Sequence, residues 1–195
     1  MSRHPGRLTA TPSQTVGPFF HFGLADNETL GSIAKPDTKG ERIGVRVRVL
    51  DGDGEPVPDA LIELWQADAD GNYVRRPENV RVLDAPGFTG FGRLPTATDG
   101  SCVFETIKPG RMRDAGGILQ APHINVCVFA RGLMRQIYTR LYFAGDEGLD
   151  QDAVLTMVPE DRRQTLLAMP DAAAPGRWTF EIRLQGAAET VFFDL

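Results

Sequence analysis

The sequence predicts an all-β protein, an antiparallel β-sandwich with a long irregular N-terminal arm and one short helix. Short stretches in which polar and apolar residues alternate recur along the chain, and turns rich in Gly and Pro separate them. Many short strands punctuated in this way are typical of antiparallel sandwiches and barrels. The chain has 195 residues, of which 42% are hydrophobic, so it is long enough for one well-buried domain.

The elements are predicted in order from these patterns. Residues 1–42 are rich in Pro, Gly, Thr and Ser without a sustained period, so we expect an arm that needs a surface to lie against. The sandwich domain is expected at 43–195. A helix is predicted at 159–169, because a proline suits its first turn and acidic residues follow at the positive end of the helix dipole. Strands are predicted at 43–50, 61–67, 101–107, 123–130, 135–143, 177–186 and 190–195.

Composition excludes several classes of function. A net charge of −5 and a pI near 5.2 argue against a nucleic-acid surface, which needs clustered Lys and Arg. The sequence contains no stretch of roughly 20 apolar residues and no signal-peptide core, so we expect no membrane partner and a cytoplasmic location. Cys102 and Cys127 lie in apolar strand-like stretches, which favours free buried thiols.

The stretch "PHINVCVF" contains a candidate metal position. Alternate residues of a strand share a face, so His123, Asn125 and Cys127 are expected to point one way. A histidine at position 125 would complete a pair of imidazoles, but an amide does not suit a ferric or zinc centre. The sequence has three histidines and no HxH or HExxH pair. This favours a buried, hydrogen-bonded His123 over a metal ligand, without excluding the ligand.

Other catalytic patterns are weaker. The sequence has no GxSxG motif, and a regular strand would place Cys127 roughly 13 Å from His123, too far for direct activation. Arg131 follows the same strand. Its guanidinium can bind a carboxylate with two hydrogen bonds, or it can be an ordinary solvated charge.

Several motifs together resemble one enzyme family. They are "TPSQTVGPFF", "LIELWQADADGNY", "GFGRLPTATDG", "TIKPG", "APHINVCVFARG", "TRLYF" and "ETVFFDL", in this order and over nearly the whole chain. On these motifs the chain resembles the intradiol ring-cleaving dioxygenases, whose fold is an antiparallel β-sandwich. The resemblance implies a two-chain enzyme in which an iron-binding beta subunit and an alpha subunit form the active site at their interface.

The resemblance also implies that the iron site of this chain is degenerate. Iron-binding chains of the family hold Fe(III) with two tyrosines and two histidines. Tyr73 and His123 match two of these ligands, whereas Met112 and Asn125 stand at the other two positions. Gln120 stands where an arginine is usual. Two of four ligands are missing, so the cofactor Fe(III) is expected in the partner beta chain and not in this one.

The implied reaction is the cleavage of 3,4-dihydroxybenzoate by O₂ to 3-carboxy-cis,cis-muconate, in which the metal supplies the difficult chemistry. This chain is expected to contribute no catalytic residue and to line the substrate pocket. The matching positions are Thr15, Gly17 and Pro18 in the arm and Arg131 at the strand end. A carboxylated substrate needs a counter-charge, which strengthens the carboxylate-binding interpretation of Arg131.

Two other functions remain open from the sequence. The stretch "GVRVRVLDGDGEPVPDALIELW" alone would suit a non-enzymatic β-sandwich that serves as a binding or scaffold module. A self-sufficient dioxygenase for another catechol is the third hypothesis, with Tyr73, His123 and further ligands not evident in the sequence.

Overall fold

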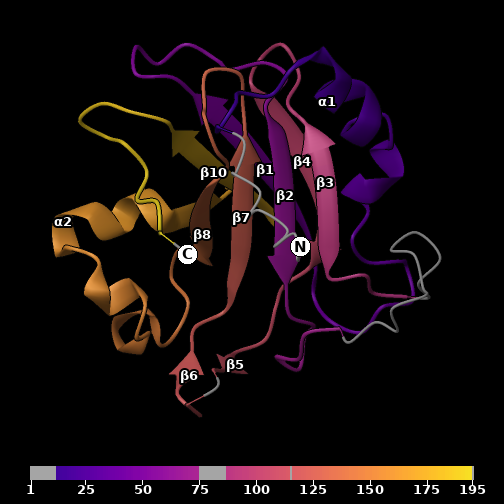
Figure 1. The fold of residues 1–195 in the computed structure, drawn as a ribbon. Helices are drawn as coiled ribbons and strands as arrows, with labels where there is room; N and C mark the ends of the chain where they lie inside the picture. The colour runs from indigo at the N-terminus through magenta and orange to yellow at the C-terminus, as the bar shows by residue number, and fades with distance from the viewer. Residues whose placement is uncertain (1–11, 75–86, 115, 195) are drawn as a thin grey trace, which may run out of the picture.

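The computed structural model describes residues 12–74, 87–114 and 116–194, and its main feature is one eight-stranded sheet (Figure 1). The strand order is β3-β2-β7-β8-β9-β10-β1-β4. The bounds are β1 Arg42–Leu50, β2 Leu61–Gln66, β3 Phe91–Pro95, β4 Ser101–Ile107, β7 His123–Phe129, β8 Ile137–Phe143, β9 Leu167–Pro170 and β10 Arg177–Arg183. Two very short strands, β5 (Met112–Arg113) and β6 (Leu119–Gln120), pair with each other below the sheet.

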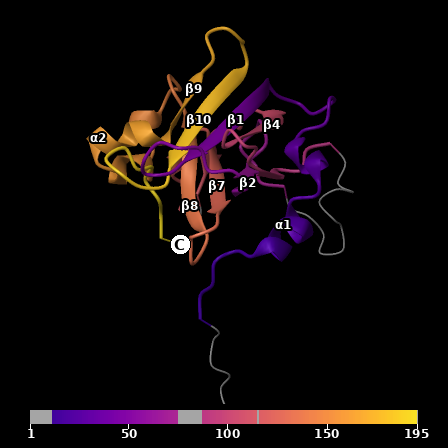
Figure 2. The same ribbon diagram turned by 90° about the horizontal axis from the view of Figure 1, so that it is seen from above.

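The sheet bends over so that two layers face each other. One layer contains β3, β2, β7 and β8, and the other contains β10, β1 and β4, as the two views together show (Figure 2). The core lies between them and takes alternate residues from every long strand. Leu64 and Val126 come from the first layer, and Val47, Phe104 and Phe180 from the second; each is at most 1% exposed.

The prediction of an antiparallel sandwich was right in part. Most neighbouring strands are antiparallel, but β1 pairs with β10 and β8 pairs with β9 in parallel. A parallel pair needs a long crossover between its strands, and here most of the chain separates β1 from β10. The fold is therefore β-rich with a mixed, nearly closed sheet.

The predicted helix at 159–169 was too long. Only Glu160–Arg163 forms an α-helix, α2; a 3-10 turn, η5 (Gln164–Leu166), and strand β9 follow. Pairing of β9 with β8 and β10 outweighs the local helical pattern. The predicted strand at 190–195 was also wrong, since the described residues there form only an isolated bridge between Phe193 and Tyr138.

The arm is more regular than predicted. It contains an α-helix, α1 (Pro18–Leu24), and a 3-10 turn, η1 (Glu28–Gly31). After these, Ile33 and Ala34 are fully buried, and Ile33 belongs to the main core. The division between an arm at 1–42 and a domain at 43–195 stays a prediction, although β1 begins next to that boundary.

A second, smaller core lies beside β8. It contains Tyr142, Leu155 and Leu166, and the 3-10 turns η3 (Leu149–Gln151) and η4 (Leu155–Met157) run along it. Cys102 and Cys127 are buried free thiols, as predicted. Among the described residues, no helix is both long and apolar enough to cross a membrane.

Candidate functional site: the two ends of strand β7

The face of β3, β2, β7 and β8 that points away from the core carries the polar side chains, and we call it the outer face. Ile124, Val126 and Val128 of β7 enter the core, so His123, Asn125 and Cys127 lie on the outer face, as predicted. The strand register continues this face across the sheet. One row contains Phe91, Trp65, Asn125 and Arg140, and the next contains Arg93, Glu63, Cys127 and Tyr138.

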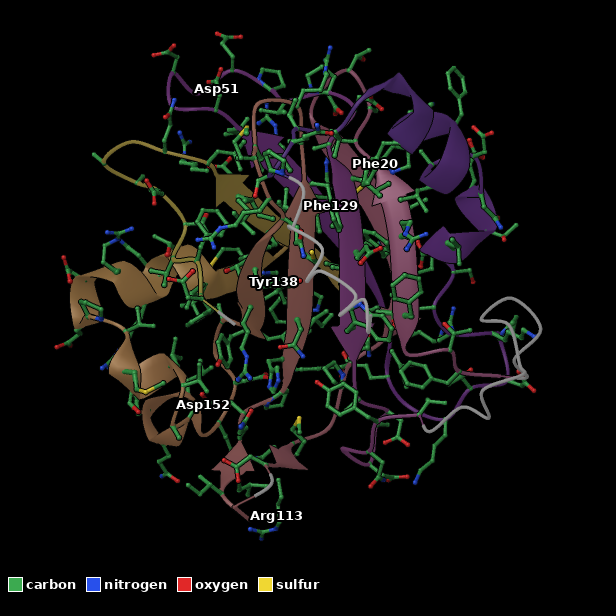
Figure 3. The ribbon with its side chains drawn as sticks, viewed as in Figure 1. Phe20, Asp51, Arg113, Phe129, Tyr138 and Asp152 are labelled. Carbon is green, nitrogen blue, oxygen red and sulfur yellow. The ribbon has the colours of Figure 1, made fainter. Side chains whose placement is uncertain are left out.

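The candidate residues fall at opposite ends of β7. Thr15, Gly17, Pro18 and Arg131 form what we call the arm end; Tyr73, Met112, His123 and Asn125 form the ligand end. Arg131 comes eight residues after His123, which corresponds to roughly 26 Å of extended chain. In Figure 3, Phe20 and Phe129 lie together at the arm end, whereas Asp152 and Arg113 lie toward the other end of the strand.

At the arm end, the N-terminal segment attaches to the turn after β7. The backbone N–H of Gly132 donates to Thr15 Oγ1 at 2.8 Å. The rings of Phe20 and Phe129 pack with centroids 5.2 Å apart. Pro18 is the first residue of α1, where its fixed φ suits a helix start. Thr15 is therefore held close to the backbone next to Arg131, although 117 residues separate Thr15 from Gly132.

A pocket of about 210 Å³ opens at the arm end. Gly17, Phe20, His21, Asp59 and Arg131 line it together with apolar neighbours. Arg131 is exposed to solvent. The pocket thus combines an aromatic ring, a cation and an imidazole–carboxylate pair at a surface open to solvent.

The His21–Asp59 pair in this pocket was not predicted as part of the site. His21 Nδ1 donates to Asp59 Oδ1 at 2.6 Å, and both side chains are about half exposed. Asp59 has a φ of 60°, and it is the only non-glycine residue with a positive φ among the described residues. Aspartate tolerates such backbone in turns, and Asp59 lies in the "VPDA" turn. The "VPDA" turn was the available signal in the sequence.

At the ligand end, His123 is buried and neutral. It is 3% exposed, and its Nδ1 lies 2.9 Å from the carbonyl oxygen of Ala121. A carbonyl can only accept, so Nδ1 carries the proton and Nε2 has the lone pair. Burial first, and then the positive charge of Arg140, lower the pKa of His123 to about 4.

Tyr73 and Asn125, which the resemblance places at two ligand positions, contact each other directly. Asn125 Nδ2 donates to Tyr73 Oη at 2.7 Å. Burial raises the pKa of Tyr73, while the charge of Arg140 and the Asn125 hydrogen bond oppose that rise. The phenol is therefore protonated near neutral pH.

Met112 and Gln120 complete the ligand end through β5 and β6. They are directly opposite each other in the β5–β6 register. A side chain added at Gly71 would come within 3.3 Å of the Met112 Cα atom, so the backbone near Tyr73 lies against β5. Gln120 is 5% exposed and points toward β8. The structure thus brings the ligand-end positions together.

Sequence reasoning missed the charged residue at the ligand end. Arg140 lies opposite Asn125 in the β7–β8 register, and its Nη1 donates to Gln120 Oε1 at 3.0 Å. The same nitrogen lies 3.4 Å from Tyr142 Oη. "TRLYF" contributed to the resemblance, but a cross-strand partner becomes evident only when the register of the two strands is known.

Behind Arg140 lies a buried carboxylate. Tyr142 Oη donates to Asp152 Oδ1 at 3.0 Å, and Asp152 is fully buried. Its two oxygens also accept from three backbone N–H groups, those of Ala121, Val154 and Leu155, at 2.8 to 3.0 Å. Tyr142 therefore links a buried carboxylate to the guanidinium on the outer face.

These residues do not fit a ferric ion. Asn125 and Met112 offer an amide and a thioether where hard anionic or imidazole donors are needed. Within 12–74, 87–114 and 116–194, no group of three or more His, Cys, Asp or Glu side chains is placed to hold a metal. His123 Nε2 keeps a lone pair suited to ligation.

Comparison with known proteins identifies the class. Residues 15–186 match the family model described as "Dioxygenase". The match covers most of the chain, and the chain belongs to the intradiol ring-cleaving dioxygenase family. The resemblance drawn from the sequence motifs is thereby confirmed.

Individual relatives sharpen this result. The chain is 43% identical to the protocatechuate 3,4-dioxygenase alpha chain of Burkholderia cepacia, over 96% of this chain and 98% of that one. It is 32% identical to the beta chain of the same enzyme, over 94% of this chain and 73% of the relative. The solved dioxygenase domain of a carbohydrate-binding fusion protein from Streptomyces sp. SirexAA-E superimposes with a TM-score of 0.60, at 28% identity, and covers 91% of this chain and 100% of that domain.

Proposed function

We propose that this chain is the alpha subunit of a protocatechuate 3,4-dioxygenase and is active only with its beta chain. One observation carries the proposal: 43% identity to an alpha chain over nearly the full length of both sequences. The enzyme would convert 3,4-dihydroxybenzoate and O₂ to 3-carboxy-cis,cis-muconate. The alternative of a non-enzymatic binding or scaffold module has no comparable support, because the family is one of enzymes.

The Fe(III) of this enzyme belongs, in our proposal, to the beta chain. The support is the donor set of the ligand end, where Asn125 and Met112 replace two ligands. The same donor set argues against a self-sufficient catechol dioxygenase. When bound in the partner, the metal supplies the activation of the dihydroxybenzoate ring toward O₂.

At the arm end, we propose that this chain binds the substrate and orients it. Arg131 is suited to the substrate carboxylate, because a guanidinium can donate two parallel hydrogen bonds to it. Thr15 holds the segment of Gly17 and Pro18 against the Arg131 turn through its bond to Gly132. Correct orientation raises the rate even when the orienting group takes no part in bond breaking.

The arm-end pocket needs a second surface to complete it. Its 210 Å³ lies below the roughly 300 to 1,000 Å³ that is usual for a small-molecule site. A beta chain that covers this pocket would enclose the substrate between the two subunits. Separate alpha and beta relatives of one enzyme support this arrangement. We expect an interface larger than about 2,000 Å² that includes the arm from Thr9 to Phe20, of which residues 9–11 lie outside the described residues.

Iron analysis of singly and jointly expressed chains tests the proposed function. The chain alone should contain no stoichiometric iron and should not cleave 3,4-dihydroxybenzoate. Co-expressed with its beta chain, it should form a stable complex that contains one iron per pair and cleaves this substrate. A tightly bound ferric ion with a tyrosinate charge-transfer colour in the isolated chain would contradict the proposal. A chain that elutes as a stable monomer and does not associate with the beta chain in gel filtration would also contradict the proposal.

A further inference from the structure

Arg140 lies beside the ligand-end residues but is not itself a possible iron ligand, because a guanidinium has no lone pair to offer. It lies on the outer face, directly across from Asn125, and its neighbour two positions along, Tyr142, lies directly across from His123. The four side chains therefore form a square on adjacent strands. Opposed residues of neighbouring strands have Cβ atoms roughly 5 Å apart, so the Arg140 side chain begins beside Asn125, one of the former ligand positions.

The hydrogen bonds of Arg140 also place it inside this set. Gln120, which stands where iron-binding chains usually have an arginine, accepts from its Nη1 at 3.0 Å. Tyr142 Oη lies 3.4 Å from the same nitrogen and donates onward to Asp152. The cation therefore has a neutral acceptor on one side and, through a phenol, a buried carboxylate on the other.

The charge of Arg140 matters because it is permanent. A guanidinium stays protonated at every pH at which a protein is folded, so it cannot lose its positive charge by deprotonation as a lysine or histidine can. Arg140 is half-buried, where solvent screens its charge less than at the open surface. A trivalent metal placed among Tyr73, His123 and Asn125 would lie beside a fixed positive charge.

We propose that the guanidinium of Arg140 occupies the degenerate site as its permanent cation. It holds the polar side chains that a metal would otherwise organise, and it excludes iron from this chain even when the missing ligands are supplied. The inference rests on the proposed function, in which the beta chain holds the iron of each pair. The loss of two ligands is then one reason that this chain holds no iron, and the charge of Arg140 is the other.

Restoring the ligands with and without Arg140 tests this inference in the co-expressed complex. The wild-type pair should contain one iron. The double variant Met112→Tyr with Asn125→His should also contain one, because the guanidinium remains. Adding Arg140→Gln should raise the content to two irons per pair and roughly double the absorbance of the tyrosinate charge-transfer band. Glutamine keeps a polar group of similar length without the charge.

Arg131 provides the matched control, because it is an arginine at the other end of the same strand. The variant Met112→Tyr, Asn125→His and Arg131→Gln should remain at one iron per pair. Each variant is first shown to assemble with the beta chain by gel filtration. Two irons in the double variant would overturn the inference, and so would one iron in an assembled triple variant that lacks Arg140. Two irons in the wild-type pair would instead contradict the proposed function.

A second measurement tests the organising role of Arg140 on its own. Arg140→Gln in the otherwise unchanged complex should lower the Tm by about 3 to 10 °C, since it removes charge-assisted hydrogen bonds at a partly buried site. Arg140→Lys keeps the charge without the planar fork and should lower the Tm by less. Equal stability of the wild type and Arg140→Gln would show that the guanidinium does not hold the polar side chains of the ligand end in place.

Discussion

The two ends of β7 carry similar side chains and use them differently. At the arm end, Arg131 is exposed, and the His21–Asp59 pair is about half exposed beside an open pocket. At the ligand end, Arg140 and Asp152 are bound within the chain through Gln120, Tyr142 and backbone N–H groups. Each end has a guanidinium, a carboxylate and an imidazole, but at the ligand end the carboxylate and imidazole are buried and the guanidinium is half-buried.

This difference indicates where the chain can still bind a ligand. A charged group that already has its partners must break them before it can bind anything else, whereas an exposed group has only water to release. The arm end therefore suits substrate binding, and the ligand end suits a structural role. The contrast predicts that mutations at the ligand end change stability and that mutations at the arm end change substrate selection.

The largest expected effect is a loss of stability at Asp152. Asp152→Ala should lower the free energy of unfolding by about 3 to 5 kcal/mol, because it leaves three backbone N–H groups and the Tyr142 hydroxyl without their acceptor in a buried place. Asp152→Asn should lose less, since an amide oxygen can still accept. Denaturant unfolding of the complex at fixed concentration measures both variants.

His21→Ala is the control from the arm end. It removes a pair whose members are about half exposed, and such pairs contribute about 0 to 1 kcal/mol. If His21→Ala proved as destabilising as Asp152→Ala, the two ends would not differ in the way described.

A pH-dependent loss of stability is expected from His123. Its pKa is about 4 in the folded chain, against about 6.5 in an unfolded one. The unfolded state therefore binds more protons between these values, so the contribution is fully present above about pH 6.5 and is lost as the pH falls toward 4. At no more than about 1.4 kcal/mol per pH unit, the loss between pH 6.5 and 4.5 amounts to about 2 kcal/mol.

The comparison of wild type with His123→Gln isolates this contribution. Glutamine does not titrate, so its complex should lose less stability than the wild type between pH 7 and pH 4.5. Parallel stability curves for the two proteins over this range would mean that His123 is not held neutral by its surroundings.

The sequence was most informative where strands are long and alternate clearly. Predicted strands at 43–50, 101–107 and 123–130 match β1, β4 and β7 within one residue, because burial of one face imposes a period of two. Strand β9 was missed because Leu167–Pro170 follows a helical pattern, and only pairing with two neighbours makes it extended. In α1, the proline start was present, but the apolar spacing over seven residues was too short to indicate a helix.

The candidate site divides in the same way. The spacing of His123 and Asn125 on one face could be derived from the strand period, and motif resemblance supplied Tyr73 and Met112. Arg140 could not be found in this way, because its importance depends on which residue of β7 it faces. Asp59 was missed because the "VPDA" turn does not show that His21, 38 residues away in the sequence, lies beside it.

At the arm end, Arg131→Ala should lower kcat/KM for 3,4-dihydroxybenzoate by about 10 to 150 fold. A hydrogen bond to a charged group contributes roughly 1.5 to 3 kcal/mol, and about 1.4 kcal/mol corresponds to tenfold. Steady-state kinetics on the complex measure the loss, and iron content should stay full.

Catechol and Arg135→Ala are the controls for this effect. Catechol has no carboxylate, so its turnover should fall much less in Arg131→Ala. Arg135 is a nearby arginine in an exposed pair with Asp194, so its removal should change neither substrate by more than about twofold. Equal losses for both substrates in Arg131→Ala would make Arg131 an interface residue and not the carboxylate partner.

The smallest expected effect is at Tyr73, and it is the sharpest test of the ligand end. Tyr73→Phe removes the hydroxyl that accepts from Asn125 at 2.7 Å and changes little else. Tyr73 is 40% exposed, so water can replace the lost acceptor, and the free energy of unfolding should fall by less than about 1 kcal/mol. Because the phenol binds no metal in our proposal, iron content and kcat/KM should stay within about twofold of wild type. The same change at an iron-binding tyrosine of a beta chain would remove a ligand. If Tyr73→Phe abolished activity or released iron from the complex, the ligand end would be functional after all, and the contrast between the two ends of β7 would fail.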